Sequence, residues 1–566
     1  MLVRDFFSGT RKVARSGTDR SCFEEMTAVQ DTFDYIVIGA GSAGCVLAAR
    51  LSESGRYRVL LLEAGDRDCN PWIHVPMGSS RLKANPRLNW MYESEPEPEL
   101  NGRTINQSVG RVLGGTSSIN GMVYMRGHPA DYDRWQQLGC TGWSWESVLS
   151  YFKKAEDQES GADEFHGVGG PLCVSDPLMR PELADRWIAA AIEAGLPPNN
   201  DFNGERQEGV GHFQSTTKRG RRWSTADAYL RPARKRQNLM IRTKAQTTRI
   251  LIEDGKAVGV TFVSGGVPQT VRLRGEVIVS AGVFNSPLLL QLSGLGPPEL
   301  LQAFGIPVIC EMPNVGADMQ DHFSSLVAFR CTKRITLNHV ANNFVRQGLA
   351  GAQYVLFRSG PLATNPTCAG AFARSDATLD RPDLQLNFIN YTVASRHRQK
   401  VRAHRFPGFT VDVVHLQPQA RGSVRIKSPD PLAPPEIRCN FLHTQQDVQA
   451  LTAGMRLART IAQEPALADY VAEEIVPGPN IRSDAEFEAS IRANGTSFGH
   501  PVGTCRMGGD EAAVLDSRLR VRGICYLRVV DASIMPSVPA GNINAPVIMI
   551  GEKAADMILE DARMRG

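Results

Sequence analysis

The sequence lacks the features that define several large classes of protein. No stretch approaches the about 18 consecutive apolar residues that a membrane-spanning helix needs, so we expect no integral membrane contact. The 11 cysteines are odd in number and form no C-x-x-C pair, which argues against a disulfide framework and against structural zinc. Neither sign of charge dominates, because 63 Lys and Arg stand against 59 Asp and Glu. The basic run 218–222 has no aromatic residues among its charges that would indicate nucleic-acid binding. We therefore predict a metal-free protein of a reducing compartment, the cytoplasm.

What is present is typical of a globular chain. The 566 residues are 42% hydrophobic and 22% charged, which at about 150 residues per domain allows three or four domains, or two large interleaved ones. Residues 1–25 have no apolar core of a secretory signal, and their acids count against a transit peptide. Met26 is an alternative start. We expect residues 1–32 to be a disordered N-terminal extension.

The segment from residue 33 has the order of a dinucleotide-binding unit. Residues 34–38 (DYIVI) predict a buried parallel strand, residues 45–54 a helix, and residues 57–63 a second strand that ends in an acid. A glycine turn, Gly39-x-Gly41-x-x-Gly44, joins the first strand to the helix. Strand, glycine turn, helix, strand and carboxylate follow one another as dinucleotide binding requires.

The three glycines, the helix N-terminus and Glu63 each have a physical role in this unit. Gly39 makes the tight turn, Gly41 lets a pyrophosphate approach the backbone, and Gly44 allows close packing of helix on strand. The helix N-terminus then presents free N–H groups to the phosphates. Glu63 would accept a hydrogen bond from the adenosine ribose and would repel a 2′-phosphate, so FAD or NAD is favoured over NADP. This unit alone does not choose between FAD and NAD.

A second glycine-rich segment, residues 110–121 (GRVLGGTSSING), favours a flavin. Its small residues would let backbone lie against a flat ring, and Ser117, Ser118 and Asn120 would offer donors to a polar edge. Together with residues 122–127 it resembles the first signature of the glucose-methanol-choline (GMC) oxidoreductase family, which binds FAD. Residues 281–296 resemble the second signature, although Val283 replaces a smaller residue.

The resemblance extends over most of the chain. Residues 423–431, 500–508 and 530–546 resemble C-terminal motifs of the same family, in its choline and alcohol dehydrogenase-like branch. It implies an α/β FAD-binding Rossmann-type domain interleaved with an α+β substrate domain built on an antiparallel sheet. The expected FAD-binding domain comprises residues 33–150, 237–322 and 485–566, and the substrate-binding domain residues 151–236 and 323–484. Between Leu239 and Gly282 we expect short strands, with Gly255 at a hairpin.

The resemblance also implies which residues bind the cofactor. Thr247 would contact the adenine end through its backbone, and Ala281 and Gly282 would lie near the adenosine. Ile119 stands where some members carry a histidine that is bonded to the flavin, so we predict FAD bound without a covalent link. The predicted FAD-binding residues are Gly39, Gly41, Ser42, Ala43, Gly44, Glu63, Ala64, Arg111, Val112, Gly114, Gly115, Ser118, Asn120, Gly121, Met122, Val123, Thr247, Ala281, Gly282, Asp531, Ala532, Asn542, Pro546 and Val547.

His500 and Asn544 are the predicted catalytic residues. An alcohol gives up hydride readily only while its hydroxyl proton is removed, and a histidine has a pKa suited to that task. Pro501 restricts the backbone of His500 to extended conformations. By resemblance Asn544 faces His500 across the substrate oxygen, with a helix cap as the alternative role. Residues 547–559 predict an apolar helix whose N-terminus would face the pyrimidine edge of the flavin.

These features predict FAD-dependent oxidation of a small-molecule alcohol to an aldehyde or ketone. The electron acceptor is left open between oxygen and a quinone, and so is the oligomeric state. The alternatives are a choline dehydrogenase, a lyase or decarboxylase of the same family, and a non-catalytic flavoprotein. The basic run 396–405 could attract an anionic substrate or an acidic membrane surface, but a solvated loop is favoured.

Overall fold

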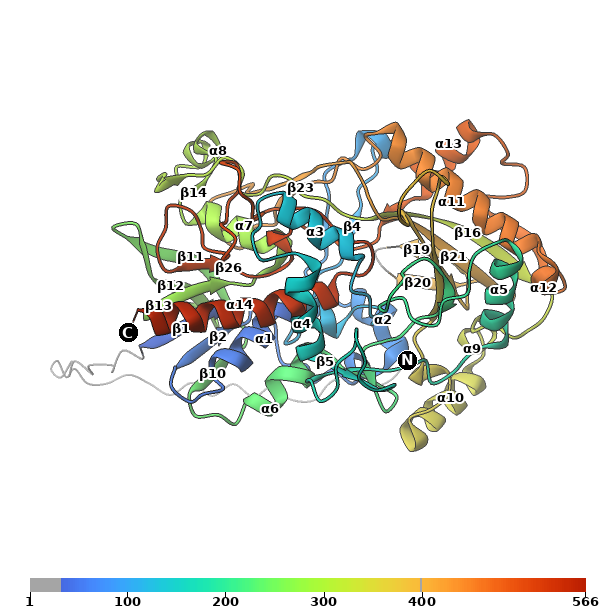
Figure 1. The fold of residues 1–566 in the computed structure, drawn as a ribbon, viewed down its shortest axis with the longest axis horizontal. Coiled ribbons are helices and arrows are strands. Elements are labelled where there is room, and N and C mark those ends of the chain that lie inside the picture. Colours follow the sequence, from blue (N-terminus) through green and yellow to red (C-terminus); the bar gives the residue numbers. More distant parts are fainter. Residues whose placement is uncertain (1–31, 398–399, 566) are drawn as a thin grey trace, which may run out of the picture. The chain divides into compact units, whose positions relative to one another are not determined.

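A computed structural model describes residues 32–397 and 400–565 of the chain. The N-terminal extension expected at residues 1–32 lies outside the described residues, except for Thr32. Within the described part, two seven-stranded sheets organise the fold, and each has its own hydrophobic core. Figure 1 shows the first sheet on the left and the second on the right.

The first sheet is built around the parallel strands β1 (Phe33–Ile38), β2 (Val59–Leu62) and β10 (Leu239–Arg242). Its order is β10-β2-β1-β13-β12-β11, with β26 (Leu527–Val529) also paired to β13. The strands β11 (Ala245–Glu253), β12 (Lys256–Ser264) and β13 (Val267–Val279) form an antiparallel meander. β13 is longer than expected because its first half completes the meander while its last residues pair in parallel with β1.

Helices cover this sheet where small residues permit close contact. α1 (Ser42–Leu51) follows β1 and packs against the C-terminal helix α14 (Asn544–Met564). A Cβ on Gly44 would lie 1.9 Å from the carbonyl oxygen of Gly39, so only glycine allows the helix to start this close to the strand. α14 begins three residues before the expected start, and Pro546 lies in its first turn, where its missing N–H costs no hydrogen bond.

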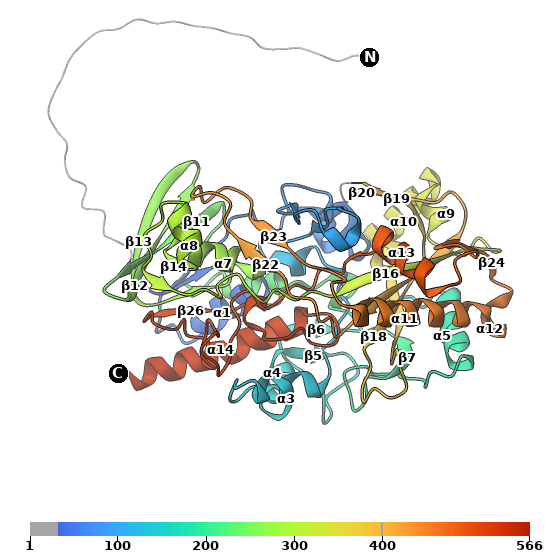
Figure 2. The ribbon, with the colours of Figure 1, turned by 90° about the horizontal axis from the view of Figure 1, so that it is seen from above.

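The second sheet is antiparallel, with the order β24-β16-β21-β18-β17-β7. Its strands are β24 (Val471–Val476), β16 (Phe323–Cys331), β21 (Gly408–His415), β18 (Leu384–Ile389), β17 (Thr367–Ala373) and β7 (Gly209–His212). The long helix α11 (Gln445–Gln463) packs on β16, β18 and β21, and Figure 2 shows it next to α5 (Glu182–Glu193). This sheet, together with the first, confirms the expected fold class.

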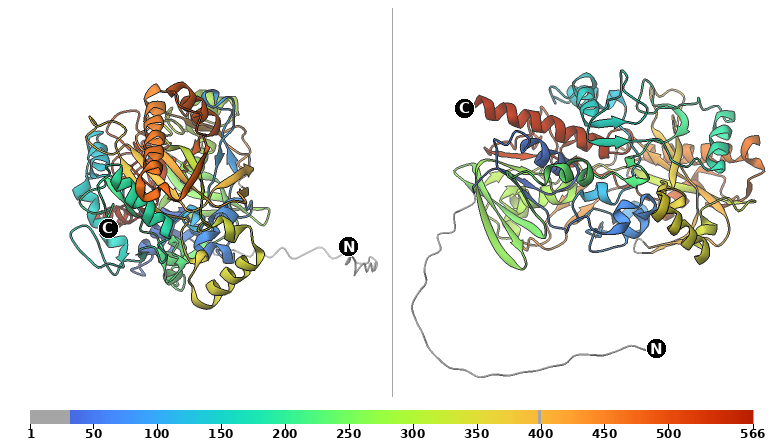
Figure 3. Two further views of the ribbon diagram at one scale, coloured as in Figure 1. Left: turned by 90° about the vertical axis from the view of Figure 1, so that its right-hand side faces the viewer. Right: turned by 90° about the horizontal axis from the view of Figure 1, so that it is seen from below.

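The segment that follows residue 484 joins the two sheets. β25 (Thr496–Ser497) pairs with β16 of the second sheet, and β26 then pairs with β13 of the first. Figure 3 shows the C-terminal helix extending along the first sheet from the region between the sheets. His500 lies three residues after the end of β25, so the expected catalytic residue stands where the chain passes from one sheet to the other.

Shorter elements complete the described structure. No helix of residues 32–397 and 400–565 is long and apolar enough to cross a bilayer. The remaining helices are α2 (Ser79–Lys83), α3 (Pro129–Gln137), α4 (Trp145–Ala155), α6 (Arg231–Ala233), α7 (Gly282–Leu292), α8 (Pro298–Ala303), α9 (Asn338–Ala341), α10 (Phe344–Phe357), α12 (Pro465–Ala468) and α13 (Asp484–Asn494). Two-stranded sheets pair β3 (Tyr92–Glu93) with β4 (Asn106–Gln107), β5 (Glu156–Gln158) with β6 (Leu172–Val174), β8 (Thr217–Lys218) with β9 (Arg221–Arg222), β14 (Leu295–Gly296) with β15 (Cys310–Glu311), β19 (Val393–His397) with β20 (Lys400–Ala403), and β22 (Ser423–Arg425) with β23 (Glu436–Arg438).

Candidate active site

The turn between β1 and α1 fits a dinucleotide phosphate. A Cβ on Gly41 would meet nothing within 4 Å, so open space lies in front of the turn. Gly41 is the N-cap of α1, no side chain caps the helix, and no acid stands in its first turn. The first backbone N–H groups of α1 are therefore free of a side-chain cap, and the positive end of the helix dipole would favour an anion.

Glu63 lies beside this turn and is 6% exposed. Its carboxylate accepts hydrogen bonds from the backbone N–H of Ala40 at 2.8 Å and of Gly65 at 2.7 Å. Burial raises the pKa of Glu63 to about 7, against the opposing effect of these two N–H groups. The carboxylate is thus fixed at the end of β2, where a ribose hydroxyl could donate to it.

The glycine-rich loop at residues 110–121 packs directly on the turn. The N–H of Gly114 donates to the carbonyl of Ala40 at 2.8 Å, and a Cβ on Gly115 would lie 2.6 Å from the Cα of Gly41. The hydroxyls of Ser117 and Ser118 donate to the carbonyls of Gly114 and Leu113 within the same loop. The expectation that they donate to a ring edge is therefore wrong, because the loop uses these hydrogens to hold its own shape.

Asn120 is likewise engaged within the protein. Its side-chain oxygen accepts from the N–H of Met122 at 3.1 Å and from Arg222 at 2.6 Å. Arg222 is 1% exposed, also donates to Ser79 and to the carbonyl of Ile73, and has a pKa that burial lowers to about 9. Sequence reasoning missed this role, since Arg222 belongs to a basic run that looks like a solvated surface.

The other predicted cofactor residues join the same region through backbone contacts. A Cβ on Gly39 would lie 2.4 Å from the carbonyl oxygen of Ser280, which places the segment of Ala281 and Gly282 beside the turn. Asp531 accepts from the N–H of Gly282 at 2.9 Å and from the Ser286 hydroxyl.

Several of the predicted FAD-binding residues have side chains that are buried within the protein. Val112 and Ile119 are 0% exposed and belong to one apolar cluster with Ile73, Leu82 and Leu88. Ala43, Met122, Val123, Ala532, Pro546 and Val547 are also at least partly buried, and Ala64 follows Glu63 at the end of β2. Arg111 stacks over the Trp90 ring at 4.5 Å. In the described residues the Thr247 hydroxyl is buried without a hydrogen-bond partner.

His500 lies at the junction of the two sheets and is 8% exposed. The Asp321 carboxylate accepts from its backbone N–H at 2.7 Å, and the Phe498 ring meets the imidazole edge to face at 4.9 Å. Nδ1 of His500 lies 3.0 Å from Nδ1 of His322, and Nε2 lies 3.1 Å from the side-chain nitrogen of Asn542. Both ring nitrogens of His500 therefore have hydrogen-bond partners.

The hydrogen-bond network fixes which ring nitrogen of His500 carries the proton. Nε2 of His322 lies 3.2 Å from the carbonyl oxygen of Leu416, which can only accept, so this nitrogen carries a hydrogen. Burial lowers the pKa of His322 to about 3, so its other nitrogen, Nδ1, is an acceptor at neutral pH. The hydrogen between the two rings belongs to Nδ1 of His500, and Nε2 of His500 keeps its lone pair.

The electrostatic surroundings keep His500 uncharged. Burial, and then the neighbouring His322 and Lys83, lower the pKa of His500 well below its ordinary value of 6.5. Nε2 therefore stays unprotonated at neutral pH and at mildly acidic pH, and its lone pair accepts a hydrogen bond from the Asn542 amide. An imidazole in this state can accept a proton from a bound hydroxyl, which is the chemistry expected of a general base.

Asn542, and not Asn544, is the asparagine that meets His500. Gln385 donates to the Asn542 side-chain oxygen at 3.4 Å, which turns the amide nitrogen of Asn542 toward His500. Asn544 is the first residue of α14, and its side-chain oxygen accepts from the Ser42 hydroxyl at 2.8 Å. The expected pairing is wrong by two positions, because Asn542 lies in the loop before α14 whereas Asn544 turns with the helix toward α1.

The contact between Ser42 and Asn544 also brings two helix N-termini together. Ser42 begins α1 and Asn544 begins α14, and neither helix has a side-chain cap. Both positive dipole ends thus lie next to one another, near the glycine turn and, through Asn542, near His500. Negative charge that develops between them would be stabilised.

Sequence reasoning missed the residues that support the site from other parts of the chain. These are His322, Asp321, Gln385 and Arg222.

A dinucleotide site with free helix N-termini, next to a buried neutral histidine, is the arrangement expected of a dinucleotide-dependent oxidoreductase. Models of the N-terminal and C-terminal parts of the GMC oxidoreductases match residues 33–324 and 418–551. The chain belongs to the GMC oxidoreductase family, as its motifs indicated.

Named relatives and solved structures agree with this assignment. An alcohol dehydrogenase [acceptor] from Pseudomonas putida is 43% identical over 536 residues, covering 94% of this chain and 96% of that protein. An oxygen-dependent choline dehydrogenase from Vibrio vulnificus is 43% identical, covering 94% and 95%. The structure of pyridoxine 4-oxidase from Mesorbium loti has a TM-score of 0.84 at 32% identity, covering 93% and 99%. An Aspergillus oryzae formate oxidase variant has a TM-score of 0.88 at 27% identity, covering 94% and 99%.

Proposed function

We propose that the protein oxidises an alcohol to an aldehyde or ketone, with FAD as its cofactor and His500 as the general base. The observation that carries this proposal is the hydrogen-bond network of His500. The contact of its Nδ1 with His322 leaves Nε2 without a hydrogen, and Nε2 faces the Asn542 amide. The alcohol and choline dehydrogenases among the relatives support an alcohol as the substrate.

The chain's own residues perform the proton transfer. A substrate hydroxyl that replaces the direct contact between Nε2 of His500 and the Asn542 amide would donate its hydrogen to Nε2 and accept a hydrogen bond from that amide. The proton then resides on Nε2, and the resulting imidazolium keeps donating from Nδ1 to His322. Bound FAD supplies the acceptor for the hydride that leaves the substrate carbon.

The residues of the turn and its surroundings fit FAD. Gly41, Ser42 and the N-terminus of α1 would hold the pyrophosphate, and Glu63 the ribose. The backbone around Thr247, Ala281 and Gly282 would hold the adenosine, and the N-terminus of α14 the pyrimidine edge. Ile119 offers no nucleophile, which supports binding without a covalent link. We assign residues 33–150, 237–322 and 485–566 to the FAD-binding domain and 151–236 and 323–484 to the substrate domain.

The acceptor of the electrons and the location in the cell complete the proposal. Oxygen and a quinone both fit the chemistry, and reoxidation by air distinguishes them. The described cysteines are all free, which supports a reducing compartment such as the cytoplasm.

The decisive experiment is the visible spectrum of the purified protein without oxygen, before and after primary, benzylic and choline-type alcohols are added. Bleaching of the oxidised flavin band by one class is the expected result, and it identifies the substrate class. Bleaching by choline alone would favour the choline dehydrogenase reading. A yellow protein that no alcohol bleaches would contradict alcohol oxidation and favour the lyase, decarboxylase or non-catalytic alternatives. A colourless protein that FAD cannot reconstitute would contradict the cofactor assignment.

A further inference from the structure

Helix α10 exposes an apolar face that the rest of the fold does not cover. Phe344 is 84% exposed, Leu356 70% and Phe357 72%. Val345, Leu349, Ala352 and Leu356 follow the i, i+4, i+7, i+11 spacing of a single helical stripe, and all of them are exposed. Large contiguous apolar surfaces on a water-soluble fold mark sites of interaction.

The opposite face of α10 anchors the helix to the protein. Ala350 and Tyr354 are its buried residues, and the Tyr354 hydroxyl donates to the carbonyl of His74 at 3.0 Å. Tyr354 packs with Val75 and Ala363 in a small apolar cluster. The orientation of α10 is thus fixed by contacts on one side, and the apolar stripe points outward. Figures 1 and 3 place α10 at the margin of the fold.

The chain segment that contains this helix carries cations and no acids. Residues 322–375 include no Asp or Glu but six arginines and lysines. Arg330 and Arg374 pair with Glu473 and Glu208 of other segments, so the cations that matter here are those nearer the helix, Arg346 and Arg358. Residues 384–411, which contain the β19–β20 hairpin, also lack acids. The side-chain nitrogen of Asn342, just before α10, donates to the carbonyl of His404, just after the hairpin, so the two acid-free segments meet. Arg402 and Arg405 are exposed there.

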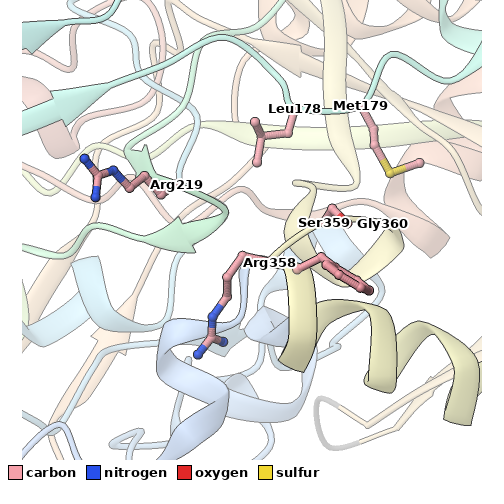
Figure 4. A pocket seen from close by; sticks show the side chains of 7 residues that line it. Leu178, Met179, Arg219, Arg358, Ser359 and Gly360 are labelled. Carbon is pink, nitrogen blue, oxygen red and sulfur yellow. The ribbon is translucent and has the colours of Figure 1, made fainter.

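A surface hollow of about 470 Å³ at the C-terminal end of α10 combines both properties. Its lining includes the apolar Leu178, Met179 and Phe357 and the cations Arg219 and Arg358. Figure 4 shows Leu178 and Met179 facing the end of the helix at Ser359 and Gly360, with Arg358 at the edge of the hollow. The structure records no ion pair for Arg219, Arg346 or Arg358 among the described residues.

We propose that α10 and its surrounding arginines dock the protein on an anionic lipid surface, with the apolar stripe in the acyl boundary and the arginines at the headgroups. An amphipathic helix with apolar and cationic residues and no acids is suited to lie in a bilayer interface. A second copy of the chain fits this face poorly, because a two-fold contact would oppose the same arginines without an acid to pair them. This docking is independent of the proposed catalytic function.

The test is sedimentation of the full-length, FAD-loaded protein with vesicles. We expect binding to vesicles of phosphatidylcholine with a quarter of phosphatidylglycerol, and weak binding to phosphatidylcholine alone or in high salt. Leu356→Gln with Phe357→Gln should lower the partition coefficient by about 100-fold or more, because two large apolar groups leave the interface. Arg346→Gln and Arg358→Gln should each lower it about fivefold on the anionic vesicles only.

Matched controls come from the far end of the fold. Met564 is 76% exposed and Arg563 is also exposed, and Figure 1 shows this end of α14 on the opposite side from α10. Met564→Gln and Arg563→Gln should bind vesicles as the parent does. Alcohol-dependent reduction of a soluble dye should be unchanged in every variant, which separates loss of docking from loss of folding or of catalysis.

Two outcomes of the sedimentation and oligomer measurements would overturn the docking proposal. One is equal sedimentation with and without anionic lipid. The other is a parent dimer that Leu356→Gln with Phe357→Gln converts to a monomer, which would assign the face to a second copy. A second measurement does not depend on a variant that loses binding. Phe357→Trp should add a tryptophan fluorescence signal, and vesicles whose lipids are brominated in their acyl chains should quench it. An added tryptophan signal that these lipids leave unquenched would also contradict the proposal.

Discussion

Replacement of His322 tests whether this residue sets the protonation of the base. In His322→Phe the hydrogen on Nδ1 of His500 loses its acceptor, which lies 3.0 Å away in a site where His500 is 8% exposed. A buried donor without a partner costs about 1–3 kcal/mol, which disfavours the tautomer with a free Nε2 by about that amount. Since about 1.4 kcal/mol corresponds to a factor of ten, we expect flavin reduction by the alcohol to slow about 10-fold to 100-fold.

The assay is anaerobic stopped-flow reduction across a pH series, at saturating alcohol. His322→Asn offers an amide oxygen that can accept from His500, so it should recover most of the rate that His322→Phe loses. A change that is only structural would lower FAD content or thermal stability and would not be rescued by the amide. His322→Phe that retains FAD and is reduced at the parental rate would refute the tautomer argument, and so would equal rates for the two variants.

Further predictions follow from the same site. His500→Ala should keep FAD but lower the rate of flavin reduction by about two to four orders of magnitude, and an unchanged rate would exclude it as the base. Asn542→Ala should slow flavin reduction about 10-fold or more. Asn544→Ala loses the contact to Ser42 and should mainly weaken FAD retention. The reverse pattern would contradict the assigned positions. Because the base must be unprotonated and the pKa of His500 is lowered, the reduction rate should stay on its plateau as pH falls through 6.5; a midpoint at or above that pH would show a base that is not depressed. Acid precipitation should release all the yellow colour, since Ile119 cannot form a link to the flavin; colour left on the pellet would disprove this.

Local signals in the sequence are enough to predict the strand, glycine turn and helix at the start of the fold. Gly39 and Gly44 are needed because the backbone of Ser280 and of Gly39, respectively, approaches too closely for a side chain, and such a need is visible as glycine in the sequence. The strands before and after the turn are short, apolar and β-branched, so their burial follows from composition. The fold class follows from these signals and from the family resemblance together.

The residues that set the chemistry were harder to find. Asn542 and Asn544 stand two positions apart in similar surroundings, and only the start of α14 decides which of them meets His500. His322 contacts His500 across 178 positions of the chain, so no local pattern relates them. Arg222 looks like a surface cation by its neighbours, yet it holds the glycine-rich loop from within. Tertiary pairing, which periodicity and spacing do not encode, determines each of these roles.

The passage of the chain from β25 to β26 limits how this enzyme can be recombined. His500, the proposed base, lies on a segment that is anchored at one end in each sheet. Neither half can therefore be exchanged with a homologue as a module without cutting through the active site. New substrate preferences would therefore have to arise by point substitution and by changes in surface loops, because exchange of a whole domain would disrupt the candidate catalytic centre.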